Sequence, residues 1–462
     1  MVDDKKHWSG KGHLRWTPNN NFDISLIAST LEYDEGTRRM NFTEIGAAMF
    51  GLPAPQDRKV SSDLEGWNKS KIDSQALKIT YDISDSFTLT SVSTRRQNDW
   101  IDETDFDFSS ATLMHVKRDN KDNKLSQELR LDSTTERLKW LVGLYYDKDQ
   151  SKQDGIITSI YPSMAGVFDQ EFDGDSYAAF AHLTYALTEQ FSLVGGLRYE
   201  NQDQEFKDNI YGTNLDDSWA GLTPKIALEY RFAPAIMTYV SASKGFRSGG
   251  FNSFAMDPQY YSYDEEQLWS YDIGIKSAFL DNRLIINGSV FYMDITDMQV
   301  EESPSPIETY TSNAAEATGK GIEVEMTAIV TDGLSIMGGF GYTNIEFDEF
   351  SDALGDYKGN KNLNAPEYTF NIGAQYRHGS GFYARADLIG YGKMYFDKAN
   401  EYSRDPYEIV NAKIGYEAEH FDVYLYAKNL FDEEYDSDGF YNGMYIIYSD
   451  PREIGLQLAY RF

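Results

Sequence analysis

The chain has 462 residues and no cysteine, and its 42 basic residues against 74 acidic ones give a formal net charge of −32. This balance argues against nucleic-acid binding, and the lack of cysteine excludes disulfide and thiol chemistry. No apolar run approaches the ~18 residues of a membrane-spanning helix. Aromatic residues nevertheless make up 15% of the chain, at a mean hydropathy of −0.54. Transmembrane β-barrels combine these properties, because only one face of each strand meets lipid.

Alternation of polar and apolar residues with period two recurs along the whole chain and predicts about nineteen strands. Between residues 222 and 232, for example, Leu222, Ile226 and Leu228 share one face, opposite Lys225 and Glu229. The expected strands are 8–17, 22–33, 73–83, 87–100, 124–133, 138–152, 174–187, 191–206, 218–232, 235–248, 265–280, 284–299, 316–330, 334–347, 363–378, 382–396, 405–418, 422–435 and 451–462.

The expected connections alternate between tight polar turns and long loops, which is the outer-membrane pattern of short periplasmic and long extracellular connections. The long loops are expected at 34–72, 101–122, 155–172, 250–264, 299–312, 347–361 and 436–450. Acidic clusters such as 99–107 and 432–438 are expected in these solvated segments. The predicted fold class is all-β, a large antiparallel transmembrane β-barrel, with Leu228, Phe370, Ile414 and Leu456 facing lipid.

The odd number of expected strands places the start of the first strand outside the cell. A secreted chain begins in the periplasm, so at least one upstream strand is expected to be missing. The opening segment MVDDKKHW is polar and lacks the apolar core of a signal peptide. Met1 is therefore expected not to be the natural start.

No arrangement of catalytic residues or metal ligands stands out. The six histidines are scattered, with no metal-ligand spacing: His7, His13, His115, His182, His378 and His420. We therefore predict no enzyme activity, no metal site and no cofactor.

Four stretches carry a family resemblance: 239–252 (YVSASKGFRSGGFN), 310–325 (YTSNAA, then GKGIEVE), 427–435 (AKNLFDEEY) and 458–462 (LAYRF). In this order and spacing they resemble the barrel of the TonB-dependent outer-membrane receptors of siderophore-receptor type. The residues that carry the motifs are Gly245, Phe246, Gly249, Gly250, Asn313, Gly321, Glu323, Asn429, Leu430, Phe431, Tyr435 and Phe462.

The resemblance implies a barrel of twenty-two strands preceded by a plug domain. Nineteen strands correspond to the fourth through the last, so an N-terminally truncated barrel over 1–462 is expected, without plug or signal peptide and not competent for transport by itself. The implied function is energy-coupled uptake of a ferric siderophore, with oligosaccharide, cobalamin or haem uptake, or a passive porin-like channel, as alternatives.

The implied location is the outer membrane of a Gram-negative bacterium, where the chain would be a monomer in contact with lipid. The implied partners are the TonB–ExbB–ExbD complex, reached through the missing plug segment, and the barrel-assembly machinery, which would read the terminal Phe462.

Aromatic residues in two long loops are candidates for ligand contact, because they could grip a catechol, a macrocycle or a sugar ring. They are Phe251, Phe254, Tyr260, Tyr261, Tyr263, Phe440, Tyr441 and Tyr445. Girdle and loop packing is the alternative for each of them. Gly319 and Gly321 are expected to mark a bulge or bend in a curved strand, and Asn429 to bond turn backbone.

Overall fold

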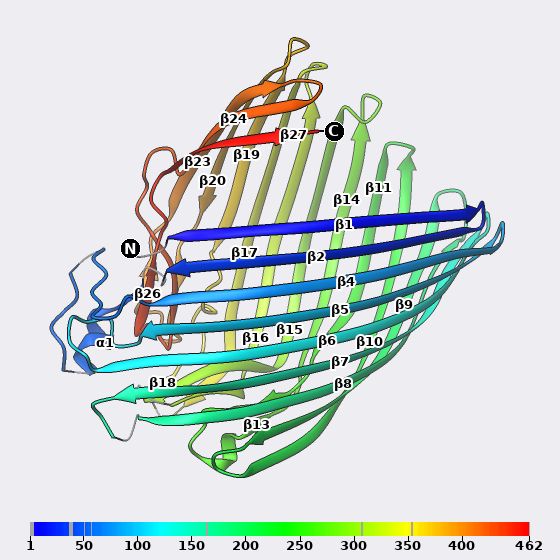
Figure 1. Cartoon of the computed structure of the whole chain (residues 1–462). Coiled ribbons are helices and arrows are strands. Elements are labelled where there is room, and N and C mark those ends of the chain that lie inside the picture. The colour runs from blue at the N-terminus through cyan, green and yellow to red at the C-terminus, as the bar shows by residue number, and fades with distance from the viewer. Residues whose placement is uncertain are drawn as a thin grey trace.

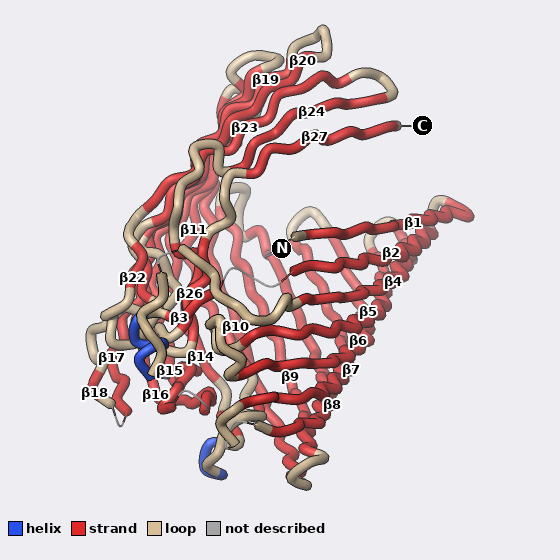
Figure 2. Tube along the Cα trace, turned by 60° about the vertical axis from the view of Figure 1, so that its left-hand side comes forward, coloured by secondary structure: helices blue, strands red, loops and turns tan. Residues whose placement is uncertain are grey.

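The computed structural model describes residues 4–36, 40–49, 51–56, 58–162, 165–305, 308–352 and 354–461. Most of these residues lie in one antiparallel sheet that curls into an open C (Figures 1 and 2). None of the helices within the described ranges is long and apolar enough to cross a membrane. The predicted all-β fold class is confirmed.

Nineteen of the twenty strands in the large sheet follow one another in chain order, each antiparallel to the next, and the twentieth is the two-residue β18 (Gly355–Asp356) beside β17. The nineteen are β1 (Lys5–Asn19), β2 (Phe22–Gly36), β4 (Trp67–Ser84), β5 (Phe87–Asp105), β6 (Met114–Thr134), β7 (Leu138–Ser159), β8 (Gly166–Ala186), β9 (Phe191–Asp208), β10 (Thr213–Ala233), β11 (Ile236–Arg247), β14 (Glu266–Phe279), β15 (Leu284–Ser305), β16 (Glu308–Ile329), β17 (Leu334–Asp352), β19 (Tyr368–Arg377), β20 (Phe382–Tyr391), β23 (Tyr407–Glu417), β24 (Phe421–Lys428) and β27 (Glu453–Tyr460).

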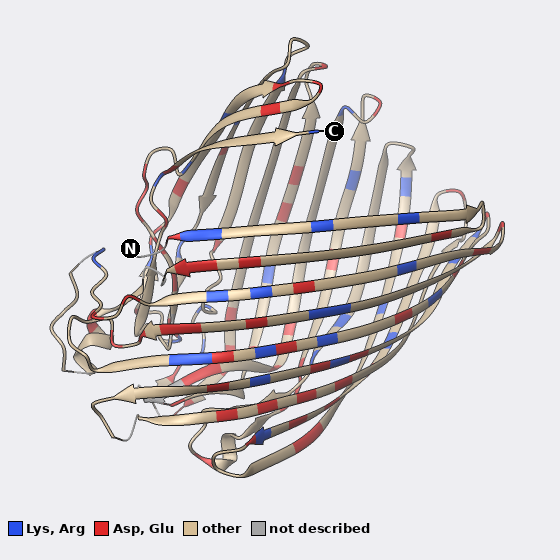
Figure 3. Ribbon diagram, viewed as in Figure 1, with Lys and Arg blue, Asp and Glu red and all other residues tan. Residues whose placement is uncertain are grey.

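The predicted number and order of strands are confirmed, but many strands extend further at the long-loop end than the alternation indicated. Residues 101–105 and 114–122, expected in a loop, belong to β5 and β6, so most of the acidic cluster at 99–107 lies on a strand. Figure 3 shows charged residues along these strands as well as in the loops. Backbone pairing continues there because a hairpin needs no apolar face once it has left the lipid.

The faces of the sheet are sorted by polarity. On β9, Phe206 and Asp208 line a cavity on the concave side, so odd-numbered residues such as Leu197 and Tyr199 face outward. A row of outward apolar residues crosses six neighbouring strands, each 39% to 60% exposed: Leu228, Val240, Ile273, Val290, Ile322 and Tyr342. This row forms part of the apolar band that a barrel presents to lipid.

Ion pairs occupy the polar face of β9, β19, β20 and β23. Arg198 bonds Glu200, Arg385 bonds Asp387 with Nε–Oδ2 at 2.7 Å, and Arg377 bonds Glu417 with Nε–Oε2 at 2.9 Å. These six charged side chains therefore satisfy one another within the sheet.

The large sheet has two edges, β1 and β27, and the described residues show no backbone pairing between them. Figure 2 shows these two strands on either side of the opening of the C. The Lys5–Asp450 ion pair, with Nζ–Oδ2 at 3.5 Å, links the two sides near the long-loop end.

The long loops carry short elements of their own. A three-stranded sheet joins β3 (Met40–Phe42), β25 (Asp436–Phe440) and β26 (Tyr445–Tyr448). The other loop elements are α1 (Glu44–Met49), β12 (Gly250–Phe251), η1 (Pro258–Tyr260), β13 (Ser262–Tyr263), β21 (Met394–Tyr395) and β22 (Ser403–Arg404). The first and last long loops are thus tied together over the outer end of the sheet.

Of the bulge or bend expected at Gly319 and Gly321, the bulge is wrong. The β15–β16 register runs without a shift past both glycines, and shifts occur instead near Met298 and between Glu316 and Ala317. Gly321 makes room for a neighbour, because a Cβ there would lie 2.2 Å from the Tyr342 carbonyl oxygen and 2.4 Å from the Phe291 ring.

Candidate ligand-binding site

A cavity of about 500 Å³ lies at the long-loop end of the concave side. Its wall comes from the outer ends of β5 to β10, and it is completed by the 252–261 loop and by residues of the last long loop. The volume falls in the range of small-molecule sites, about 300–1,000 Å³. Segments far apart in the sequence therefore build one concave site.

Aromatic rings dominate the cavity wall. Phe168 meets Phe254 edge to face with ring centroids 6.1 Å apart, which joins a strand to the 252–261 loop. The aromatic residues that line the cavity are Phe106, Phe168, Phe206, Tyr211, Phe254, Tyr261, Tyr441 and Tyr445. Burial raises the pKa of both Tyr441 and Tyr445, so their hydroxyls stay protonated at neutral pH and can donate hydrogen bonds.

One cation is fixed in the wall. The guanidinium of Arg118 is held by Asp102, with Nε–Oδ1 at 3.0 Å and Nη2–Oδ2 at 2.8 Å. It also lies over the rings of Trp100 and Phe106, at 5.3 and 6.0 Å from their centroids. A bidentate and stacked arginine is pre-organised, so it can meet an anionic group of a ligand without losing much freedom.

A second polar contact point is the amide of Gln170, which is only 2% exposed. Its Nε2 donates to Asp208 at 3.2 Å and to the Ser253 carbonyl oxygen at 3.1 Å. Its Oε1 has no hydrogen-bond partner within the part of the chain that the structure describes. A buried acceptor of this kind is costly unless a donor reaches it, and it borders the cavity.

The predicted loop aromatics divide into two groups. Phe254, Tyr261, Tyr441 and Tyr445 line the cavity. The others for which side-chain contacts are described pack against the protein: Phe251 on Trp219 (centroids 5.7 Å apart), Tyr260 on Tyr310 (4.0 Å), and Tyr263 against Gly250. The side chain of Phe440 lies outside the described residues.

The glycines of the Gly-rich motif allow the backbone at 249–250 to pack closely against Trp219 and Tyr263. A Cβ at Gly249 would lie 2.2 Å from the Tyr263 carbonyl oxygen and 2.3 Å from the Trp219 indole nitrogen. At Gly250 it would lie 2.5 Å from the Tyr263 hydroxyl. Glycine is therefore required for close approach of the loop to the wall.

Two motif asparagines tie loop backbone together. Asn313 accepts the Asp264 N–H at 2.7 Å and donates to the Asp297 carbonyl oxygen at 2.8 Å. Asn429 accepts the Glu433 N–H and donates to the Glu433 carbonyl oxygen, both at 2.8 Å. Both residues act on loop geometry, as expected for Asn429.

The remaining motif residues hold strand ends or lie on the surface. Tyr435 stacks on Tyr407 with centroids 3.8 Å apart, and the Phe246 ring covers Gly221. Gly245 and Glu323 lie within regular strands, the Leu430 N–H bonds the Val410 carbonyl oxygen, and Phe431 is 74% exposed. Phe462 lies outside the described residues.

The sequence interpretation missed the strand side of the cavity. Phe106, Arg118, Phe168 and Gln170 fell within segments expected to be loops. Their positions in the sequence could have indicated this role, because they continue the inward-facing side of hairpins that extend beyond the lipid-facing band.

The chain forms a curled antiparallel sheet with an apolar outer face and a polar inner face, and a cavity lies at its outer end. These features are those of an outer-membrane β-barrel receptor. The chain matches the family described as TonB dependent receptor-like, beta-barrel, over residues 12–430, and it belongs to that family. TonB-dependent receptors are transporters of the Gram-negative outer membrane and not enzymes. They bind ferric siderophores and interact with TonB.

The chain is similar to the pesticin receptor of Yersinia pestis, at 25% identity in an alignment of 359 positions that covers 73% of this chain and 51% of the receptor. It is also similar to the ferric-pyoverdine BN7/BN8 receptor of Pseudomonas putida, at 25% identity over 66% of this chain and 36% of that receptor. The chain thus spans about half or less of the length of these curated relatives.

Solved structures share the fold. The siderophore receptor PiuA of Acinetobacter baumannii aligns with a TM-score of 0.84 at 17% identity, covering 99% of this chain and 74% of that one. The ferric yersiniabactin uptake receptor of Yersinia pestis aligns with a TM-score of 0.80 at 19% identity, covering 98% and 70%.

Proposed function

We propose that this chain forms the barrel wall and outer binding cavity of a receptor for energy-coupled uptake of a ferric siderophore. The observation that carries the proposal is the aromatic cavity at the long-loop end, with Arg118 fixed in its wall and with a Gln170 Oε1 that has no hydrogen-bond partner among the described residues. Flat aromatic groups stack on such rings, and ferric catecholates are anionic, which suits Arg118.

Relatives support the ligand class. Curated relatives are named for ferric pyoverdine and for ferrioxamine, both of which are siderophore complexes. An oligosaccharide, cobalamin or haem is the alternative ligand, since each has a face that can stack on Tyr or Phe. The acidic cavity residue Asp208 is already engaged by Gln170 and by two backbone N–H groups, which leaves little acceptor capacity for sugar hydroxyls.

The proposal includes the parts through which such a receptor works. A plug would fill the lumen and reach the TonB–ExbB–ExbD complex, and the terminal Phe462 would be read by the barrel-assembly machinery. Further strands would pair with β1 and β27, because unsatisfied N–H and C=O groups at a sheet edge are costly in lipid. By itself the described sheet would bind ligand without transporting it.

Closure of the edges can be measured by amide exchange in native outer membranes. Slow exchange along β1, comparable with that of β7, is expected if further strands pair with it. Fast exchange of every second β1 amide would contradict closure.

The ligand class is tested by fluorescence titration of the full chain in outer-membrane vesicles. The probes are a ferric catecholate, a ferric hydroxamate, cobalamin, haem and a maltooligosaccharide. Saturable quenching by a ferric chelate at submicromolar concentration, with at least tenfold weaker binding of its iron-free form, is expected. Saturation by the sugar, cobalamin or haem alone would overturn the siderophore proposal.

A further inference from the structure

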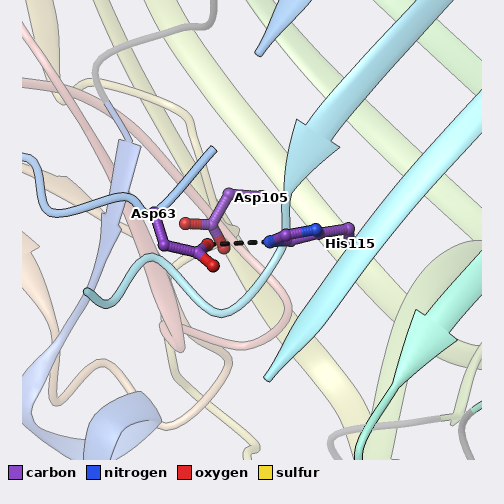
Figure 4. Close-up of side chains that lie close together, drawn as sticks. All are labelled: Asp63, Asp105 and His115. Atoms are coloured by element: carbon purple, nitrogen blue, oxygen red, sulfur yellow. Dashed lines mark hydrogen bonds and ion pairs between the residues drawn. The ribbon is translucent and has the colours of Figure 1, made fainter. Parts of the chain in front are cut away.

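A second cluster of polar residues lies at the outer end of β5 and β6, apart from the ligand cavity. Asp105 is the last residue of β5 and its register partner His115 is the second residue of β6. Asp63 reaches them from the loop that precedes β4. Figure 4 shows the three side chains converging from these three segments.

The three side chains are close enough to share one small ion. His115 Nε2 lies 2.7 Å from Asp63 Oδ1. One ligand atom from each of Asp63, Asp105 and His115 lies within 4.8 Å of the others. The second Asp63 oxygen accepts a hydrogen bond from the Thr112 hydroxyl, which fixes the orientation of the carboxylate.

An ion pair between Asp63 and His115 explains only part of this geometry, because it leaves Asp105 unexplained. Asp105 is 3% exposed. Its Oδ1 accepts the N–H groups of Asp107 and Phe108, at 2.9 and 3.0 Å. Its Oδ2 has no hydrogen-bond partner among the described residues.

The nearby hydroxyl of Ser62 does not supply a hydrogen bond to Asp105 Oδ2, because Ser62 Oγ donates its proton to the Leu64 carbonyl oxygen at 2.7 Å. Figure 4 shows the Asp105 carboxylate directed at the Asp63–His115 pair. A buried carboxylate oxygen without a donor carries a desolvation penalty, and a cation at this point would remove it.

We infer that Asp63, Asp105 and His115 form a binding site for one divalent transition-metal cation of the zinc class. Two carboxylates and a neutral imidazole supply two negative charges, which match the charge of the ion. One imidazole nitrogen with two carboxylate oxygens suits zinc, whereas calcium takes six to eight oxygen ligands. Water would complete the coordination.

Small movements of the three side chains would bring their ligating atoms to coordination distance. In a tetrahedral site with bonds of about 2.0–2.2 Å, ligand atoms lie about 3.4 Å apart. The 2.7 Å contact between His115 and Asp63 would therefore open slightly, and the Asp105 oxygen, within 4.8 Å of both, would adjust to the same spacing.

This cation would be structural and distinct from the iron that the receptor carries. It would fasten the loop before β4 to the β5–β6 hairpin. Phe106 and Met114 lie next to Asp105 and His115 in the sequence and line the ligand cavity. The site would thus hold one wall of the cavity in place.

The test is competition for Zn²⁺ between the full chain in outer-membrane vesicles and a chromogenic chelator of micromolar affinity. The wild-type chain is expected to withdraw one equivalent of Zn²⁺. Asp105→Asn is the decisive variant, because it keeps the Asp63–His115 pair and removes only the unpartnered carboxylate. It should weaken Zn²⁺ binding at least tenfold, as should His115→Ala.

Matched controls are Asp85→Asn and His378→Ala, which lie in exposed turns at the other end of the sheet and should bind Zn²⁺ as the wild type does. Asp63→Asn provides a second carboxylate variant in case Asp105→Asn does not assemble, as judged by heat-dependent gel mobility. Zn²⁺ binding that is equal in wild type and both carboxylate variants, or absent from the wild type, overturns the inference.

Discussion

The rings of Phe42 and Tyr445 stack with centroids 4.9 Å apart, although the two residues come from opposite ends of the chain. Their backbones are also register partners in the small sheet formed by β3, β25 and β26. Phe108 meets both rings edge to face, at 5.8 and 5.4 Å. This contact fastens the first and last long loops beside the cavity, close to the open side of the sheet.

Replacement of Phe42 by Ala should therefore loosen both loops. Removal of a buried phenylalanine costs about 3–5 kcal/mol, and Phe42 is 2% exposed. Limited proteolysis of vesicles should show new cleavage within 40–66 and 436–450. Phe431→Ala is the control, since that ring is 74% exposed. Unchanged cleavage in Phe42→Ala would show that the stacked pair does not hold the loops.

Gly249→Ala should disturb the 250–263 loop. The added methyl would meet the Tyr263 carbonyl oxygen and the Trp219 indole, neither of which can move freely. Overpacking of this kind costs about 1–3 kcal/mol, and the Trp219 emission spectrum should shift. Gly12→Ala, with nothing within 4 Å of the new methyl, should have no effect. Identical spectra for the two variants would contradict the close approach.

The buried ion pair of Lys398 and Asp352 should stabilise the outer β17–β18 hairpin across a wide pH range. Burial alone would raise the pKa of Asp352, but hydrogen bonds from Lys398 and the Leu354 N–H outweigh it and hold the pKa below 3.8. A carboxyl with a depressed folded-state pKa contributes stability above its unfolded pKa and loses it as the pH falls through the folded value. The contribution should thus be complete at pH 5 to 7 and disappear only below pH 3.8.

Lys398→Met should remove this contribution and leave Asp352 and Glu302 uncompensated, since both lie beside the ammonium group. Breaking one partner of a buried pair costs about 3–5 kcal/mol. Hydrogen-exchange protection of 349–357 is expected to fall at pH 7 in the variant and to be equal at pH 5 and 7 in the wild type. A wild-type hairpin that already opens at pH 5 would refute the assignment.

Because the outward face meets lipid, substitutions at neighbouring residues on opposite faces should have very different effects on stability. Ile226 is 58% exposed on the apolar face of β10, and a lysine near the bilayer midplane costs about 2–4 kcal/mol. Ile226→Lys should lower the urea midpoint of the vesicle-bound chain. Lys225→Gln, on the opposite face, should leave it almost unchanged. Equal effects at the two positions would mean that the faces are not sorted.

Period-two alternation predicted the strands because lipid imposes it directly on residues such as Leu228 and Ile273. Where strands leave the lipid, as at Asp102 and Arg118, that constraint ends, and polar hairpins resemble loops in the sequence. The partners of the loop residues could not be predicted either. Tyr445 meets Phe42, and Asp63 meets His115, only because the sheet curls and brings distant loops together.

Substitution of aromatic residues in the cavity wall tests directly whether the ligand binds there. A ferric catecholate is titrated into vesicles that contain the wild type, the double variant Phe254→Ala, Tyr441→Ala, or the control Phe431→Ala, and the quenching of tryptophan fluorescence is followed. Binding should be at least tenfold weaker for the double variant and unchanged for the control. Equal affinity in all three chains would contradict a binding site between the outer loops and the ends of β5 to β10.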